Sequence, residues 1–297
     1  MKNRLTSFGF WLGTNLLWRL PEGVSRAAFR LIADVLWKFN TKSIRQLKMN
    51  LSRVLPEQDE RQIHRLAREG IRSYMRYYCE TFLLGKWSVA KIESSMRAEN
   101  LAPVQEALQS GGIILTLPHS GNWDLAGAWA TRTLRQISTV AERLKPESVF
   151  LKFLNLRTGI GIDVTPLTGV TGVYELLRER LLQGNIVPLL GDRDVAKSGM
   201  SNDFFGVRTS LPVGAAMLAL DTGRPIFTCS TWYDGEQLVI TFDEPIYVEQ
   251  REVAPRQRLK VAQETTAEIA KRFEDHIRRH PADWHMLQPV WKDLVAS

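Results

Sequence analysis

Residues 112–124 carry the sequence GIILTLPHSGNWD, and this stretch decides the fold class. Its first part, Gly112–Leu117, is a short apolar run bounded by glycine and proline, which is typical of a strand buried on both faces. A helix is predicted from about Trp123 to Leu134. A turn containing His119 and Gly121 joins the two. The stretch therefore predicts a strand, a tight turn and a helix, the repeating unit of α/β sheets.

The same alternation continues to the end of the chain. Further strands are predicted at Ile137–Ala141, Asn185–Leu190, Pro225–Tyr233 and Leu238–Phe242, with a strand or connection at Gly161–Pro166. Further helices are predicted at Val149–Thr158, Val170–Gln183, Leu211–Thr222 and Val261–Arg279. Strand–helix alternation predicts an α/β fold with a mixed central sheet flanked by helices on both faces. We expect one domain over residues 1–297, with an α/β catalytic core at 100–290.

Residues 1–85 differ from this core, because they lack strand patterns and predict helices. Apolar stripes indicate helices at 24–39, 41–54 and 57–84. On the last of these, five arginines recur every three or four residues: Arg61, Arg65, Arg68, Arg72 and Arg76. Such a stripe is most often a solvated helix face.

The net charge of +7 is unevenly placed. Residues 1–80 hold 15 Lys and Arg against 7 Asp and Glu, whereas the other 217 residues hold 24 against 25. Anionic lipid, an acidic ligand or nucleic acid can each explain a basic segment, as can a merely solvated surface. Nucleic acid is disfavoured, because no recognition motif is present. Only two cysteines, Cys79 and Cys229, occur, which favours a reducing compartment.

The N-terminal segment Met1–Leu20 is apolar, with Trp11 and Trp18 and with cationic residues near its ends. It falls short of the run of about 20 apolar residues that a membrane span needs. A helix lying in a bilayer interface and an ordinary core helix both fit this pattern. With the basic residues that follow, it makes residues 1–85 a candidate membrane-facing region.

Two segments place reactive side chains just beyond predicted strands, where α/β enzymes bind their substrates. In the first, His119 ends one strand and Asp124 opens the next helix. A turn through Gly121 can return the Asp124 carboxylate to the imidazole, which would orient His119 as a general base for an alcohol. No serine nucleophile elbow is present, which favours direct attack by an acceptor hydroxyl. In the bland alternative, Asp124 or Asn122 only caps the helix.

The second segment is Gly191–Asp194, after the strand Asn185–Leu190. Charged residues at the mouth of a buried strand are costly unless they are paired or functional. The spacing of Asp192 and Asp194 can hold a divalent metal, as in many sugar-nucleotide transferases. An ion-paired turn is the alternative.

The block HSGNWD at 119–124, preceded by GIIL at 112–115, resembles the HxxxxD block of glycerolipid-type acyltransferases. The chain as a whole, from about residue 5 to 290, resembles the late lipid-acyltransferase family that acylates lipid A precursors, and within it the actinobacterial branch of phosphatidylinositol mannoside acyltransferases. The fragments that carry this resemblance are LKMNLSRV at 47–54, RSYMRYY at 72–78, GDRD at 191–194, DFFG at 203–206 and LPVGAA at 211–216.

The resemblance implies a hydrophobic groove for an acyl chain, an acyl-CoA donor and no metal. It implies His119 as catalytic base, Asp124 as its orienting partner, and an acidic residue after the second strand, Asp192 or Asp194, that helps to activate the histidine. Glu142 and Arg157 match a family glutamate and arginine on the acceptor or charge-relay side. We assign Arg193 and Asp194 to substrate binding as well, and Asp192 to catalysis.

The expected function is therefore transfer of a long, palmitoyl-like acyl group from acyl-CoA to a mannose hydroxyl of a phosphatidylinositol mannoside. The expected location is peripheral, on the cytoplasmic face of the cell membrane, against an anionic surface. One alternative acceptor is a lipid A precursor or another glycolipid. Alternatives of other classes are a metal-dependent glycosyltransferase that uses Asp192 and Asp194, and a non-catalytic lipid-binding protein. Acyl-chain length, the acylated hydroxyl and the oligomeric state do not follow from the sequence.

Overall fold

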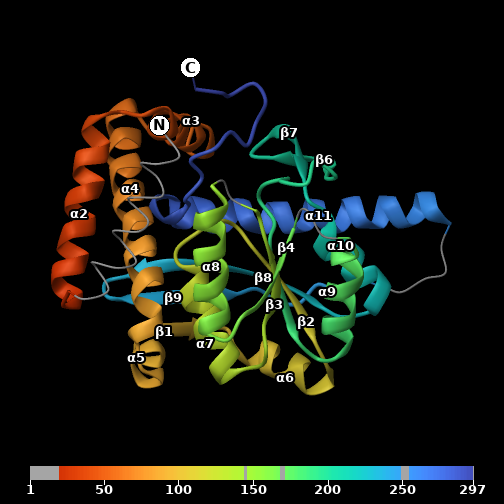
Figure 1. The fold of residues 1–297 in the computed structure, drawn as a ribbon. Coiled ribbons are helices and arrows are strands. Elements are labelled where there is room, and N and C mark those ends of the chain that lie inside the picture. Colours follow the sequence, from red (N-terminus) through yellow and green to blue (C-terminus); the bar gives the residue numbers. More distant parts are fainter. Residues whose placement is uncertain (1–19, 144–145, 168–170, 249–253, 297) are drawn as a thin grey trace.

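The computed structural model describes residues 20–143, 146–167, 171–248 and 254–296 (Figure 1). Their α-helices are α2 (Glu22–Lys38), α3 (Lys42–Val54), α4 (Glu60–Leu83), α5 (Val89–Ser94), α6 (Ala102–Ser110), α7 (Trp123–Thr133), α8 (Glu147–Gly159), α9 (Val173–Leu182), α10 (Gly214–Thr222) and α11 (Pro255–Arg279). Short 3-10 helices are η2 (Leu84–Lys86) and η3 (Pro281–Asp283). The strands are β1 (Met96–Glu99), β2 (Ile113–Leu117), β3 (Ser138–Ala141), β4 (Asp163–Pro166), β5 (Ile186–Leu190), β6 (Met200–Phe204), β7 (Val207–Leu211), β8 (Ile226–Asp234) and β9 (Gln237–Phe242).

The central sheet has five strands in the order β1-β9-β8-β2-β5. Strand β2 runs parallel to both of its neighbours, β5 and β8, whereas β8 and β9 form an antiparallel pair. The parallel pair β3–β4 adjoins β5 through a bridge between Ile137 and Ile186. The sheet is therefore mixed, as the sequence predicts. All five residues of β2 are buried, which explains why this strand is a continuous apolar run.

Helices cover both faces of this sheet (Figure 1). Alternate side chains of β2 enter two different cores: Ile113 and Leu115 pack with Leu125 of α7, whereas Ile114 packs with the residues of α9, α10 and α11, including Phe273. Burying each such side chain stabilises the fold by roughly 1.5–3 kcal/mol. The predicted α/β sandwich is confirmed, and its central strand ends at the candidate site.

The N-terminal helices pack beside this core, with α2 alongside α4 (Figure 1). Asp34 of α2 accepts hydrogen bonds from Arg68 and Arg72, at 2.8–3.3 Å. Arg76 donates to Glu80 within α4, at 2.7 Å. Three members of the predicted arginine stripe thus hold helices and buried groups together, and the interpretation of the whole stripe as a solvated face is wrong.

Several parts of the structure differ from the sequence-based expectations. Helices α5 and α6, strand β1 and the β6–β7 hairpin were not expected, and α11 begins six residues earlier than predicted. The helix predicted at Met1–Leu20 lies outside the described residues, except for Leu20. Among the helices that the structure describes, none is both long and apolar enough to cross a bilayer.

Candidate active site

The register of the sheet brings His119 and Asp192 together. Leu117, the last residue of β2, pairs in parallel with Leu190, the last residue of β5. His119 and Asp192 each lie two residues beyond these partners, so the two side chains leave the sheet at the same edge. Nδ1 of His119 lies 2.6 Å from Oδ1 of Asp192, and the backbone N–H of His119 donates to Oδ2 at 2.9 Å.

Asp192 is fully buried, and its hydrogen bonds keep it ionised. Burial alone raises the pKa of this carboxyl, but the charge and hydrogen bonds of His119 and the indole N–H of Trp284 outweigh burial and hold the pKa below its usual value. Because a carboxylate can only accept, Nδ1 of His119 carries the proton and donates it to Asp192. The lone pair of Nε2 is then free, and this nitrogen has no hydrogen-bond partner among the described residues.

The expected pairing of His119 with Asp124 is wrong. No hydrogen bond joins these two side chains in the described part of the chain. Asp124 lies in the first turn of α7, 1% exposed, and accepts from Nε of Arg157 at 2.6 Å and from the hydroxyl of Tyr77 at 2.9 Å. From helix α7, Asp124 points toward α4 and α8, where it pairs with the positively charged Arg157. The register of β2 and β5 places Asp192, instead of Asp124, next to the imidazole.

The Asp124–Arg157 pair has strong electrostatic consequences. Burial lowers the pKa of the Arg157 guanidinium, but the Asp124 carboxylate outweighs burial, and the pKa is raised. Burial and then the charge of Asp124 raise the pKa of Tyr77 well above its usual value. Arg157 and Tyr77 therefore both stay protonated, and the Asp124–Arg157 pair ties α7 to α8 beside the site.

The remaining predicted residues lie at the same cavity but have different partners. Glu142, just beyond β3, forms an ion pair with Arg193 at 3.3 Å. Arg193 also donates to Gln288 at 3.4 Å. Asp194 accepts from the N–H of Gly199 at 2.9 Å and from Ser210 at 2.7 Å, so it holds its own loop against β7. Asp192 and Asp194 therefore serve separate groups, and this arrangement lends no support to a shared metal site.

The segment at 283–285, which the sequence reasoning missed, packs against the site. After α11 the chain returns to the turn at 119–121. There the N–H of His285 donates to the carbonyl of His119 at 2.7 Å, and the N–H of Gly121 donates to the carbonyl of Asp283 at 2.9 Å. Trp284 adds the indole bond to Asp192 at 2.8 Å. Tyr77 was missed as well. A concentration of aromatic residues at 74–78 and the polar and aromatic cluster His280–His285 are the only sequence signals for these roles.

His119 opens into a cavity of about 710 Å³, which is within the range of ligand-binding cavities. Most of its wall is apolar and comes from both faces of the sheet, with Ala126 and Ala130 from α7, Phe153 from α8, and Met217 and Leu218 from α10. The polar lining includes His119, Asp124, Glu142, Arg157, Arg193 and Asp194. An imidazole with one free nitrogen beside a large apolar cavity could take a proton from a hydroxyl that lies next to a hydrocarbon substrate.

Comparison with known proteins identifies a family and relatives that match nearly the whole chain. The family model described as bacterial lipid A biosynthesis acyltransferase matches residues 2–293. The phosphatidylinositol mannoside acyltransferase of Mycolicibacterium smegmatis is 34% identical over 290 residues, 97% of this chain and 92% of that protein. The protein of the same name from Mycobacterium tuberculosis is 35% identical over 297 residues, 98% of this chain and 90% of the relative. Both relatives thus align over nearly their whole length.

Among solved structures, the 1-acyl-sn-glycerophosphate acyltransferase PlsC from Thermotoga maritima aligns with a TM-score of 0.38 and 15% identity, over 84% of this chain and 98% of that one.

The fold and site described above define an α/β enzyme with a histidine–carboxylate pair beside an apolar cavity. The chain belongs to the bacterial lipid A biosynthesis acyltransferase family.

Proposed function

We propose that this protein transfers a long acyl group from acyl-CoA to a mannose hydroxyl of a phosphatidylinositol mannoside. The observation that carries the proposal is the free Nε2 of His119, in an imidazole whose other nitrogen is bonded to buried Asp192, at the wall of a large apolar cavity. The names of the two mycobacterial relatives support the choice of acceptor.

In the proposed reaction, Nε2 of His119 takes the proton of the acceptor hydroxyl as its oxygen attacks the thioester carbon. The acyl–sulfur bond breaks, an acyl–oxygen bond forms, and the imidazolium returns the proton to the CoA thiolate. Asp192 holds the ring in the required tautomer and stabilises the imidazolium. His119 and Asp192 carry out these steps, Trp284 holds Asp192 through its indole N–H, and no metal ion is required.

Two further features support a glycolipid acceptor. The apolar lining provides room for hydrocarbon, and the Glu142–Arg193 pair, 3.3 Å apart and partly exposed, offers hydrogen-bond partners for sugar hydroxyls. We propose that Arg157 acts indirectly, by fixing Asp124 and the start of α7, rather than by binding substrate.

We also propose that the enzyme works while bound to the surface of an anionic membrane. Helix α2 and the residue that follows it expose large apolar side chains, with Leu31 65% and Phe39 72% accessible, and Arg30 and Lys38 are exposed on the same helix. An amphipathic surface of this kind binds at the headgroup level, through apolar contact and attraction to anionic lipid.

The test is a product assay. Purified protein is incubated with isotope-labelled palmitoyl-CoA and vesicles that contain either phosphatidylinositol mannoside or a lipid A precursor, and the lipids are analysed by mass spectrometry. We expect the label on the mannoside. His119→Ala should lower turnover by about 10²–10⁴, and Asp192→Asn should also lower it, because the tautomer-fixing charge is lost. His64→Ala, at an exposed histidine of α4, controls for histidine loss.

Asp124→Asn separates the observed role of Asp124 from the expected one. It leaves Arg157, whose side chain is only 17% exposed, without its countercharge, which costs up to about 3–5 kcal/mol of folding stability, and the His119–Asp192 pair is untouched. Label on the lipid A precursor alone would change the acceptor and keep the chemistry. Absence of labelled glycolipid, or wild-type rates in both His119→Ala and Asp192→Asn, would overturn the proposal.

A further inference from the structure

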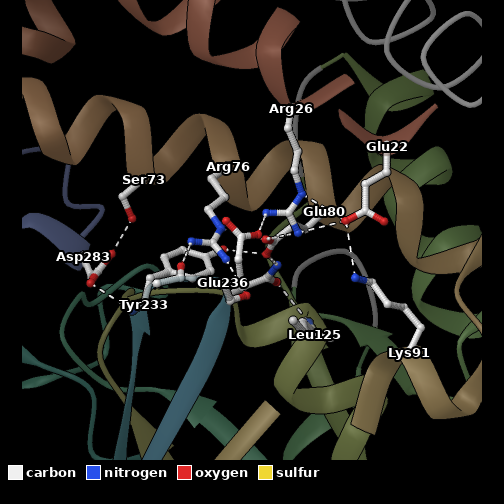
Figure 2. Close-up of polar contacts among 12 residues, drawn as sticks. Glu22, Arg26, Ser73, Arg76, Glu80, Lys91, Leu125, Tyr233, Glu236 and Asp283 are labelled. Atoms are coloured by element: carbon white, nitrogen blue, oxygen red, sulfur yellow. Dashed lines mark hydrogen bonds and ion pairs between the residues drawn. The ribbon is translucent and has the colours of Figure 1, made fainter. Parts of the chain in front are cut away.

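A buried carboxylate outside the cavity is hydrogen-bonded to the turn at residues 119–124, called the catalytic turn below. Glu80 of α4 is 1% exposed and does not line the cavity. Arg76 donates to its Oε1 at 2.7 Å, and the guanidinium of Arg26, on α2, lies 3.4 Å from the same oxygen. Tyr233 of β8 donates to Oε2 at 2.8 Å, as does the amide of Asn122 at 3.0 Å. Figure 2 shows Arg26, Arg76 and Tyr233 converging on Glu80.

One of these donors belongs to the catalytic turn itself. Asn122 lies between His119 and Asp124, and its Oδ1 accepts from the N–H of Leu125 at 3.0 Å, which caps the N-terminus of α7. A carboxylate offers no donor, so Glu80 dictates that the amide nitrogen of Asn122 faces it and that the amide oxygen faces Leu125. An aspartate would cap α7 equally well, but it would bring a second carboxylate against Glu80.

We propose that Glu80 is a positioning residue, which fixes the turn at 119–124 through Asn122 and links that turn to α2 through Arg26. Glu80 touches no substrate and contributes by holding the amide that starts α7. Its kinetic consequence rests on the proposed function, because it acts through His119. A group held in place by a buried network loses rate when its geometry relaxes by as little as about 1 Å.

The network connects segments that are far apart in the chain. Arg76 also donates to the carbonyls of Gly235 and Glu236 in the turn between β8 and β9, at 2.7 and 2.8 Å. Arg26 donates to Glu236 at 2.9 Å. Glu80 is therefore the point where α2, the β8–β9 turn and the catalytic turn meet, and charge neutrality there depends on it.

The decisive experiment exchanges the two groups. Both oxygens of Glu80 accept hydrogen bonds, so in Glu80→Gln the NH₂ group of the new amide must face another donor whichever way it is turned. In Asn122→Asp, two carboxylates face each other. The double variant puts an amide at 80 against a carboxylate at 122, which restores the donor–acceptor pair and leaves the net charge unchanged. We expect each single change to lower kcat by about 10- to 100-fold with KM for acyl-CoA nearly unchanged, and the double change to recover most of this loss.

Hydrogen exchange of the 119–129 segment provides a readout that does not depend on activity. Exchange should rise in each single variant and return toward the wild-type rate in the double variant. Glu274→Gln is the matched control: Glu274 of α11 accepts from the N–H of Phe205 and from Arg278, away from the site, so its loss should lower the thermal midpoint without changing kcat. Should Glu80→Gln not fold, Asn122→Ala carries the kinetic and exchange tests.

Losses that add in the double variant would overturn the proposal. So would wild-type kcat and exchange in both single variants, or, if Asn122→Ala is used, in that variant. The two proposals fail separately. An inactive wild-type protein would refute the acyltransferase function, while the exchange pattern would still report whether Glu80 fixes the turn.

Discussion

The stability of this protein should fall in mild acid because of His285. This side chain is buried beside the catalytic turn, with Nε2 2.9 Å from Oγ of Ser73, which in turn donates to Asp283 at 2.5 Å. Its Nδ1 is buried without a hydrogen-bond partner among the described residues. Burial, and then the charge of His119, lower the pKa of His285 to about 3. The folded protein therefore keeps this imidazole neutral.

The sign and size of the effect follow from linkage. In the unfolded chain His285 has its ordinary pKa of about 6.5, so between about pH 6.5 and 3 the unfolded state binds a proton that the folded state rejects. Stability falls as pH falls through this window, by about 1.4 kcal/mol per unit, or about 2 kcal/mol at pH 5. The pKa of Asp192 is lowered from 3.8, so its contribution is complete above that value and is lost only in stronger acid.

Two neighbours, His280 and Asp283, also change the pH dependence, and both are present in the wild-type protein and in a variant of His285. Burial lowers the pKa of His280, which adds a loss of the same sign. Burial raises the pKa of Asp283 above its ordinary value of 3.8, so the folded protein takes up that proton before the unfolded chain does, which offsets part of the loss of stability in acid. The comparison is therefore made between pH 7 and pH 5.

Urea unfolding, followed by tryptophan fluorescence, measures the difference. His285→Gln keeps an N–H near Ser73 and removes the titrating ring. The free energy of unfolding of the wild-type protein should drop between pH 7 and 5 by about 2 kcal/mol more than that of the variant. His64→Gln, at an exposed histidine, controls for the substitution itself. Equal pH dependence in the wild-type protein and His285→Gln would refute the argument that burial keeps His285 neutral.

Two other predictions concern the donor and the membrane. Hydrolysis of acyl-CoA without acceptor should be slow but measurable and should persist in EDTA, because water can replace the hydroxyl in front of His119; strict Mn²⁺ or Mg²⁺ dependence, with loss in Asp194→Ala, would favour the glycosyltransferase alternative. Vesicles that contain phosphatidylinositol should bind the protein better than neutral vesicles, and salt should weaken binding, since each nearby Lys or Arg contributes about 1 kcal/mol. Leu31→Ser with Phe39→Ser should weaken it further, and equal binding to both vesicles at low salt would show that the basic segment is only a solvated surface.

Local sequence patterns were sufficient for the elements that build the site. The apolar runs of β2 and β5 and the helices α7 and α8 lie close to their predicted positions, because a buried strand gives a short continuous apolar run and a packed helix gives apolar residues three or four positions apart. Strand β1 has four residues, MRAE, and the β6–β7 hairpin is largely polar, so neither carries such a pattern. These segments depend on pairing with partners that no local pattern identifies.

The site itself was only partly predictable, for the same reason. That His119 and Asp192 share one edge followed from the two strand ends, but the choice between Asp192, Asp194 and Asp124 depended on the β2–β5 register. The spacing of His119 and Asp124 suggested a local pair. That argument omitted Arg157, 33 residues further along the chain, which binds Asp124 through a partly buried ion pair.

The catalytic turn owes its conformation mainly to segments that lie far from it in the sequence. Gly121 has φ +54°, and a Cβ there would come within 2.6 Å of the carbonyl oxygen of Thr231, so the turn can pass this strand only with glycine. Thr231 itself donates to the carbonyl of Ser120 at 2.5 Å, while Asp283 accepts from Gly121. With Glu80 holding Asn122 from the opposite side, each residue of the turn from 119 to 122 is held by a partner at least 40 positions away. His119, the proposed base, is thereby held in its geometry before substrate arrives, and the proposed reaction then requires little reorganisation.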